Sequence, residues 1–265
     1  MAGKKDDKPQ ETLPATKEEA GLPTVINFEE DAGAGFEDAD ASCFAIPFMR
    51  MLQSGSPQCK KMDPAYIKGA EEGDMINTVT GELYKGEHGV MIIPVHLIHK
   101  YNLWAPKRGG FKGSLSPAEY ATAAKHKETI QSEQGPREVE VHTASGNIIT
   151  DTREHYVLIC QPNGTTVPAL VSLASTQLKR SKKWSTLMDG IKLASGKTAP
   201  MFSQIYMITP EAESNDSGSW VSYHIEHVKE VTNPNAYAAA KKLQSMIRTG
   251  AVTTSAPGGD EDTPF

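Results

Sequence analysis

The fold class is decided by residues 75–106, which read MINTVTGELY (75–84), KGEHG (85–89) and VMIIPVHLIHKYNLWAP (90–106). The first and third segments are rich in β-branched, aromatic and other apolar residues, and the short segment between them contains two glycines. Such runs on either side of a glycine-containing loop are typical of a β-hairpin. The sequence therefore predicts two paired strands over 75–84 and 90–106.

Strand signals continue on both sides of this segment. Apolar or alternating runs predict further strands at 43–52, 138–143, 148–151, 153–161, 165–173, 201–210 and 220–231. Helix signals are fewer, and they predict helices at 116–131, 174–193 and 235–249. The first of these begins at Ser116, a suitable N-cap that is followed by proline and, three positions on, by glutamate.

This element count predicts a mainly β protein with a few helices, in the α+β class. Strands and helices do not alternate as they do in βαβ units, so we expect an antiparallel sheet or barrel. A barrel like the oligonucleotide-binding (OB) fold, with insertions, fits the count, and other β-rich folds fit it equally well.

Charge divides the chain into three parts. Residues 1–42 carry 4 basic and 11 acidic groups, residues 43–250 carry 23 basic and 19 acidic groups, and the last fifteen residues carry three acids and no base. We expect a disordered acidic arm over 1–41, one OB-like binding domain over 42–250 and a flexible acidic tail over 251–265. A mildly basic body between acidic ends favours a polyanion as ligand, although acidic ends that only aid solubility would give the same pattern.

Cysteine content and hydropathy predict the cellular compartment. Three widely spaced cysteines, an N-terminus without an apolar leader and the absence of a long apolar run predict no membrane contact and a reducing compartment. We therefore expect a cytoplasmic protein, in the host-cell cytoplasm if the source is viral.

Two motifs resemble enzyme or metal sites, but each lacks a feature that such a site requires. Residues 195–198 read SGKT, like the end of a phosphate-binding loop, but Ile191 replaces the required glycine and Pro200 interrupts the helix that should follow. Two H-x-x-H pairs, at 96–99 and 224–227, fall on predicted strands, where positions i and i+3 point to opposite faces. We predict no catalytic residue, no cofactor and no metal, and thus no enzyme.

Two alternatives stay open. A metal-dependent nuclease would need scattered acids to meet in space, and the available ones include Asp74, Glu82, Asp151 and Glu154. A virion or scaffold protein would need no such site.

The C-terminal tip carries the most specific signal in the chain. Its functional residues are three adjacent acids, a proline and a terminal aromatic: Asp260, Glu261, Asp262, Pro264 and Phe265. The acids and the terminal carboxylate concentrate negative charge, the proline restricts the backbone, and the ring supplies an apolar anchor. We expect these five residues to contact a partner protein that offers an apolar pocket with a basic rim.

This tip resembles the acidic C-terminal peptide of bacterial single-stranded DNA-binding proteins, which ends in an Asp-rich run followed by hydrophobic-Pro-Phe. Thr263 stands where that peptide has an apolar residue. The segments MINTVTGELY, GVMIIPVHLIHKYNLWAP and STQLKRSKKW are similar to tailed-phage DNA-binding proteins. The resemblance implies a phage-type single-stranded DNA-binding protein that acts in replication or recombination, and whose tail recruits other replication or recombination proteins.

A surface for single-stranded DNA needs cations for the phosphates and flat rings for the bases. The first segment that combines them, at 99–112, supplies the candidates Lys100, Tyr101, Trp104, Lys107, Arg108, Phe111 and Lys112. The alternative for its tryptophan is inward packing at the end of a strand.

The second basic segment, at 177–184, supplies the candidates Lys179, Arg180, Lys182 and Lys183. The alternative for these cations is a solvated helix face. Trp184 begins an apolar series at helical spacing that continues with Leu187, Met188 and Ile191, so we expect its ring in the core.

Overall fold

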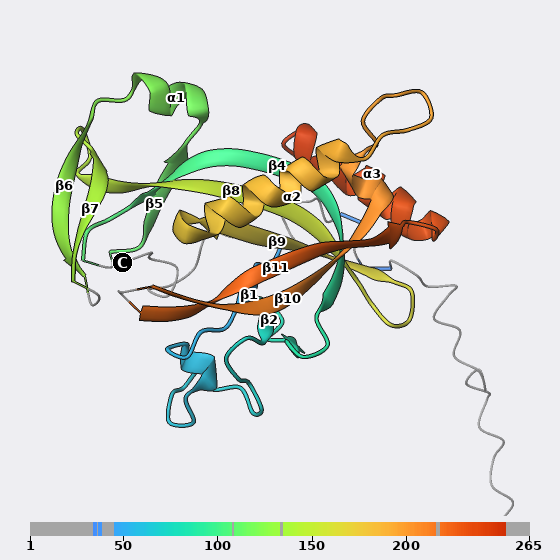
Figure 1. The fold of residues 1–265 in the computed structure, drawn as a ribbon, viewed down its shortest axis with the longest axis horizontal. Coiled ribbons are helices and arrows are strands. Elements are labelled where there is room, and N and C mark those ends of the chain that lie inside the picture. The colour runs from blue at the N-terminus through green and yellow to red at the C-terminus, as the bar shows by residue number, and fades with distance from the viewer. Residues whose placement is uncertain are drawn as a thin grey trace, which may run out of the picture. The chain divides into compact units, whose positions relative to one another are not determined.

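A computed structural model describes residues 34–35, 37–38, 45–107, 109–132, 135–215 and 218–252 (Figure 1). The chain divides into two units, Met1–Ala39 and Asp40–Phe265. In the first unit the described residues form two short turns, and Gly35 N donates a 2.8 Å hydrogen bond to Glu37 Oε2. Most of the predicted acidic arm and of the predicted tail, with its five partner-binding residues, lies outside the described residues.

All the described strands and helices belong to the second unit. A three-stranded antiparallel sheet has the order β1-β2-β3, with β1 (Met49–Met51), β2 (Met75–Asn77) and β3 (Leu83–Tyr84). An eight-stranded antiparallel sheet contains β4 (Val90–Trp104), β5 (Phe111–Leu115), β6 (Lys125–Ser132), β7 (Gly135–His142), β8 (Asn147–Cys160), β9 (Thr166–Ala174), β10 (Gln204–Asn215) and β11 (Gly218–Glu230). Its order is β11-β10-β4-β8-β7-β6, with β5 paired to β4 and β9 paired to β8.

Helices complete the unit. The α-helices are α1 (Pro117–Thr122), α2 (Leu178–Gly190) and α3 (Pro234–Arg248), and the short 3₁₀ turns are η2 (Pro57–Cys59), η3 (Ser175–Gln177) and η4 (Met201–Ser203). The expected class, mainly β with a few helices, is confirmed. Within the described residues no helix is both long enough and apolar enough to span a membrane.

The paired strands β4 and β8 form the spine of the larger sheet, and apolar residues cover both faces of part of it. On one face Ile92 and Val157 join a core cluster with Trp184 of α2, and on the other face Ile93 joins a cluster with Ala240 of α3. Because both faces are buried here, this part of β4 reads as a continuous apolar run and not as an alternating one.

The OB-fold barrel is not confirmed, because neither sheet closes on itself within the described residues. An isolated bridge joins Phe48, just before β1, to Leu170 of β9. After β1, the Gln53 side chain forms the pair of hydrogen bonds with Val221 of β11 that a neighbouring strand would form. Val221 N donates to Gln53 Oε1 at 2.8 Å, and Gln53 Nε2 donates to Val221 O at 3.0 Å.

The predicted hairpin over 75–106 is wrong. Strands β2 and β3 pair with each other inside the predicted first strand, while β4 pairs with β10, β8 and β5. The cause is a side-chain turn: Asn77 Oδ1 accepts hydrogen bonds from Val79 N and Thr80 N, both at 3.0 Å, and reverses the chain early.

The predicted helix over 116–131 is correct only at its start. Ser116 and Glu119 form a reciprocal capping box, but α1 ends at Thr122 and the next segment is strand β6. Ile130 of β6 packs against the buried Val139 and Val141 of β7, and this tertiary contact favours the strand. The other two predicted helices are confirmed as α2 and α3.

Candidate nucleic-acid interface

Helix α2 is held against the sheet by its tryptophan. Trp184 is fully buried, stacks on His155 of β8 at 4.4 Å between ring centroids, and meets Tyr206 of β10 edge-on at 5.8 Å. Its predicted place in the core is confirmed. A second contact, 2.8 Å between His155 Nε2 and Ser181 Oγ, ties the same side of the helix to β8.

The buried histidine adds no charge to this region. Burial, together with the charge of the nearby Arg153 guanidinium, lowers the pKa of His155 to about 3. The imidazole is therefore neutral at physiological pH, so any attraction of α2 for anions must come from its lysines and arginine.

Two of the four cations predicted on α2 are neutralised by strand β10. Lys179 Nζ lies 2.7 Å from Glu213 Oε2, and Arg180 forms ion pairs with both Glu211 and Glu213. Burial alone would raise the pKa of Glu213, but the hydrogen bonds from Lys179 and Arg180 hold it below its usual value. These two cations therefore fasten α2 to the β10 strand.

The other two cations point to solvent. Lys182 and Lys183 are exposed, and neither forms an ion pair with any residue that the structure describes. They share a helix whose opposite side is fixed by Trp184, and Figure 1 shows this helix lying across the strands of the sheet. The result is a pair of adjacent positive charges on a rigid support.

The first basic segment is mostly built into the sheet. Lys100 Nζ lies 2.6 Å from Glu154 Oε1, and the glutamate side chain is only 2% exposed. Burial raises the pKa of Glu154, and the Lys100 charge partly opposes that rise. Lys100 thus serves an internal ion pair.

The tyrosine of this segment has a protein ring as its neighbour. Tyr101 stacks on Tyr120 of α1, with centroids 3.6 Å apart and planes at 6°. Lys125 Nζ lies 4.1 Å from the Tyr120 centroid, and Tyr120 OH donates to Glu140 Oε2 at 2.7 Å, which raises the pKa of that phenol to about 12. This stack holds α1 on the sheet.

Trp104 adopts the alternative arrangement, inward packing. It is 4% exposed and meets Phe111 of β5 edge-on at 5.6 Å. Of the remaining candidates, Lys107 and Lys112 are exposed, and Arg108 lies outside the described residues. Of the predicted cations that the structure describes, four lysines are both exposed and without an ion pair to a described residue: Lys107, Lys112, Lys182 and Lys183.

The residues missed by sequence reasoning are chiefly the counterions. Glu211 and Glu213 are two positions apart on a strand and so share a face, a spacing that could have indicated a partner for a basic helix. Tyr120 gave no signal, because its role depends on how α1 folds back onto β4.

The four acids considered for a metal-dependent nuclease have separate partners. Asp74 pairs with Lys85, Glu82 accepts from Tyr84 OH, Asp151 pairs with His99 and Arg153, and Glu154 pairs with Lys100. Among the described residues, no group of three or more His, Cys, Asp and Glu side chains is placed to hold a metal ion.

Comparison with known proteins gives one match. A family model described as Pam3 phage gp34-like protein matches residues 16–253. The chain belongs to this family. The matched range contains both basic segments of this Pam3 phage gp34-like protein and ends before its acidic tip, and the match supports the expected phage origin. No curated protein and no solved structure matched.

Proposed function

We propose that this Pam3 phage gp34-like protein binds and protects single-stranded DNA during replication or recombination. The observation that carries the proposal is the exposed pair Lys182 and Lys183, which has no counterion in the described part of the chain and lies on an anchored helix. Lysines without a protein counterion can neutralise phosphates and release condensed counterions from the nucleic acid.

Two further lysines, in the first basic segment, are additional candidates for phosphate contacts. Lys107 lies in the turn between β4 and β5, Lys112 lies at the start of β5, and both are exposed. The half-buried rings of Tyr101 and Phe111 belong to the same segment and offer limited aromatic surface to bases. Phosphate contacts therefore dominate the proposed binding, and weak sequence preference follows from the lack of base-edge readout.

We also propose that the body is a divergent OB-like barrel. Strands β1, β4, β8, β9, β10 and β11 all contribute to the largest apolar cluster, as expected of strands arranged around one core. Support for near-closure comes from the Phe48–Leu170 bridge and from the Gln53 side chain, which occupies the place of a strand at Val221.

The acidic tip has a separate role in this proposal. Its five residues, identified from the sequence, recruit replication or recombination proteins through a charged, aromatic-ended peptide. Oligomeric contacts are not needed for this role.

A titration with single-stranded and duplex DNA of equal length, at low and high salt and without Mg²⁺, tests the function. We expect tighter binding to the single strand, little dependence on base composition and an affinity that falls as salt rises. Equal or stronger duplex binding would contradict the proposal. Cleavage on addition of Mg²⁺ would favour a nuclease, and absence of DNA binding would favour a virion or scaffold protein.

A further inference from the structure

The loop between β1 and β2, residues 53–73, packs around a small apolar cluster that it shares with Ile76 of β2 and Leu83 of β3. Its ends are joined by two backbone hydrogen bonds, from Leu52 N to Asp74 O at 2.8 Å and from Gly73 N to Leu52 O at 2.9 Å. Inside it, Ala70 packs with Leu52 and with the half-buried Cys59 and Ile67. The loop therefore has a fixed shape.

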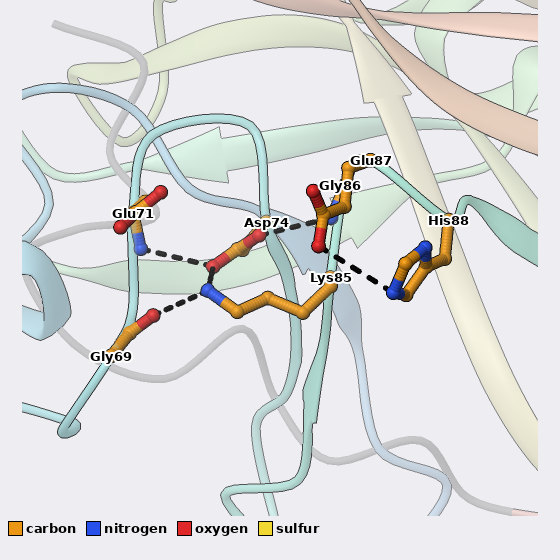
Figure 2. A network of polar contacts seen from close by, with 7 residues as sticks. All are labelled: Gly69, Glu71, Asp74, Lys85, Gly86, Glu87 and His88. Atoms are coloured by element: carbon orange, nitrogen blue, oxygen red, sulfur yellow. Dashed lines mark hydrogen bonds and ion pairs between the residues drawn. The ribbon is translucent and has the colours of Figure 1, made fainter.

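A buried aspartate fastens this loop to the segment that follows β3 (Figure 2). Asp74 accepts hydrogen bonds from Lys85 Nζ at 2.8 Å, Gly86 N at 2.9 Å and Glu71 N at 3.0 Å. Burial alone would raise the pKa of Asp74, but these bonds hold it below its usual value. A Cβ at Gly86 would lie 2.3 Å from Gly73 O, so the approach of the two segments requires glycine there.

The tip of the loop is ordered by turn hydrogen bonds. Lys60 N donates to Pro57 O, Asp63 N donates to Lys60 O, and Ala65 N donates to Asp63 Oδ1, each at 2.9 Å. This arrangement displays Met62, whose residue surface is 96% exposed, the highest among the large hydrophobic residues that the structure describes. Lys60 and Lys61 precede it, are both exposed, and have no ion pair within the described ranges.

We propose that this tip is a second contact for single-stranded DNA, with Met62 against an unpaired base and Lys60 and Lys61 on the adjacent phosphates. The proposal rests on the proposed function. A thioether packs favourably against aromatic rings, and apolar side chains such as methionine can wedge between bases. A fully exposed methionine on a fixed support, beside two free lysines, provides both kinds of contact.

A lipid surface is less well matched by the same features. Recognition of anionic lipid usually requires a cluster of four or more basic residues. This loop has only three lysines, and it also presents the exposed acids Glu71 and Glu72. A narrow strand that contacts the tip alone avoids those acids.

The base contact is tested with Met62→Ser and with Val79→Ser as the matched control, since Val79 is also an exposed apolar residue on a turn. Each variant is titrated with an oligothymidine and with an abasic oligomer of equal length. Met62→Ser should bind the oligothymidine roughly 2- to 10-fold more weakly and the abasic oligomer as the wild type does. Val79→Ser should match the wild type on both.

The phosphate contact is tested with Lys60→Gln/Lys61→Gln against Lys241→Gln/Lys242→Gln, an exposed adjacent pair on α3. The loop variant should reduce the log–log salt slope by about 0.7 for each lysine, and the α3 variant should not. Wild-type affinity for the oligothymidine in Met62→Ser overturns the contact while leaving the proposed function standing. The contact is also overturned if Met62→Ser weakens binding only to vesicles that contain phosphatidylserine. A wild-type protein that binds no oligomer overturns both proposals.

Discussion

The two basic segments, 99–112 and 177–184, have similar compositions, and in both of them cations paired with acids differ from cations without such a partner among the described residues. Each combines cations with a tryptophan, and in each the tryptophan is buried. In the first segment Lys100 forms an ion pair with Glu154. In the second segment the cations that face β10 form ion pairs with Glu211 and Glu213. The other described lysines of the two segments, Lys107, Lys112, Lys182 and Lys183, are exposed and form no ion pair with any residue that the structure describes.

The contrast between paired and unpaired cations shows that composition identifies segments that could bind an anion, while the folded structure decides which of their cations are available. On α2, positions 179 and 180 approach β10, and positions 182 and 183 lie in solvent. In the first segment, Lys100 lies on the central strand β4, whereas Lys107 lies in the turn after β4 and Lys112 lies at the start of β5. Each segment thus contains cations that form ion pairs with acids and cations that do not, and substitution of the two groups should affect stability and DNA binding differently.

The largest effect is expected from Trp184→Ala. Removing a fully buried indole that contacts His155 and Tyr206 should lower the free energy of unfolding by about 3–5 kcal/mol. Lys183→Ala, one position away and exposed, should change it by no more than about 0.5 kcal/mol. Urea denaturation measures both. An unchanged midpoint for Trp184→Ala would mean that its ring is not in the core.

A somewhat smaller effect, with a pH signature, is expected from Lys100→Met. The change leaves the buried Glu154 carboxylate without its cation, which should cost about 3 kcal/mol at neutral pH. Burial already raises the pKa of Glu154 in the folded protein, and loss of Lys100 removes the opposing effect. A carboxyl whose folded pKa is raised favours folding at low pH and loses that contribution as pH rises through the folded pKa.

The penalty of Lys100→Met should therefore be smaller at about pH 5 than at about pH 8. Denaturation of the wild type and the variant at both values measures it. The double variant Lys100→Met/Glu154→Gln is the control, because it removes the uncompensated charge and should abolish the pH dependence. Equal penalties at both pH values would contradict a buried ion pair.

Much of the fold followed from local sequence patterns. The capping box at Ser116 and the helical spacing of Trp184 and Met188 each act within a few residues, and each is present in the structure. One error arose where distant contacts decide. The strand at 125–132 depends on its pairing with β7, whereas the early reversal at Asn77 is a local side-chain turn that the strand prediction over 75–84 missed.

The sequence predicted the basic character of the candidate site but not which of its cations are paired with acids. Charge pattern indicated two basic segments, but the partners Glu154, Glu211 and Glu213 are separated from their cations by about thirty to fifty positions along the chain. Only the folded structure could show that Lys182 and Lys183 are the cations of their segment that form no ion pair with a described residue.

The central claim is that the exposed lysines without an ion pair to a described residue, and not the cations paired with acids, contact the phosphates of single-stranded DNA. The most direct test compares the salt dependence of binding for Lys182→Gln/Lys183→Gln and Lys179→Gln/Arg180→Gln, two double variants on the same helix. The first should reduce the log–log slope by about 0.7 for each lysine, and the second should leave the slope close to that of the wild type. A wild-type slope in Lys182→Gln/Lys183→Gln, with the reduction appearing in Lys179→Gln/Arg180→Gln, would contradict the account.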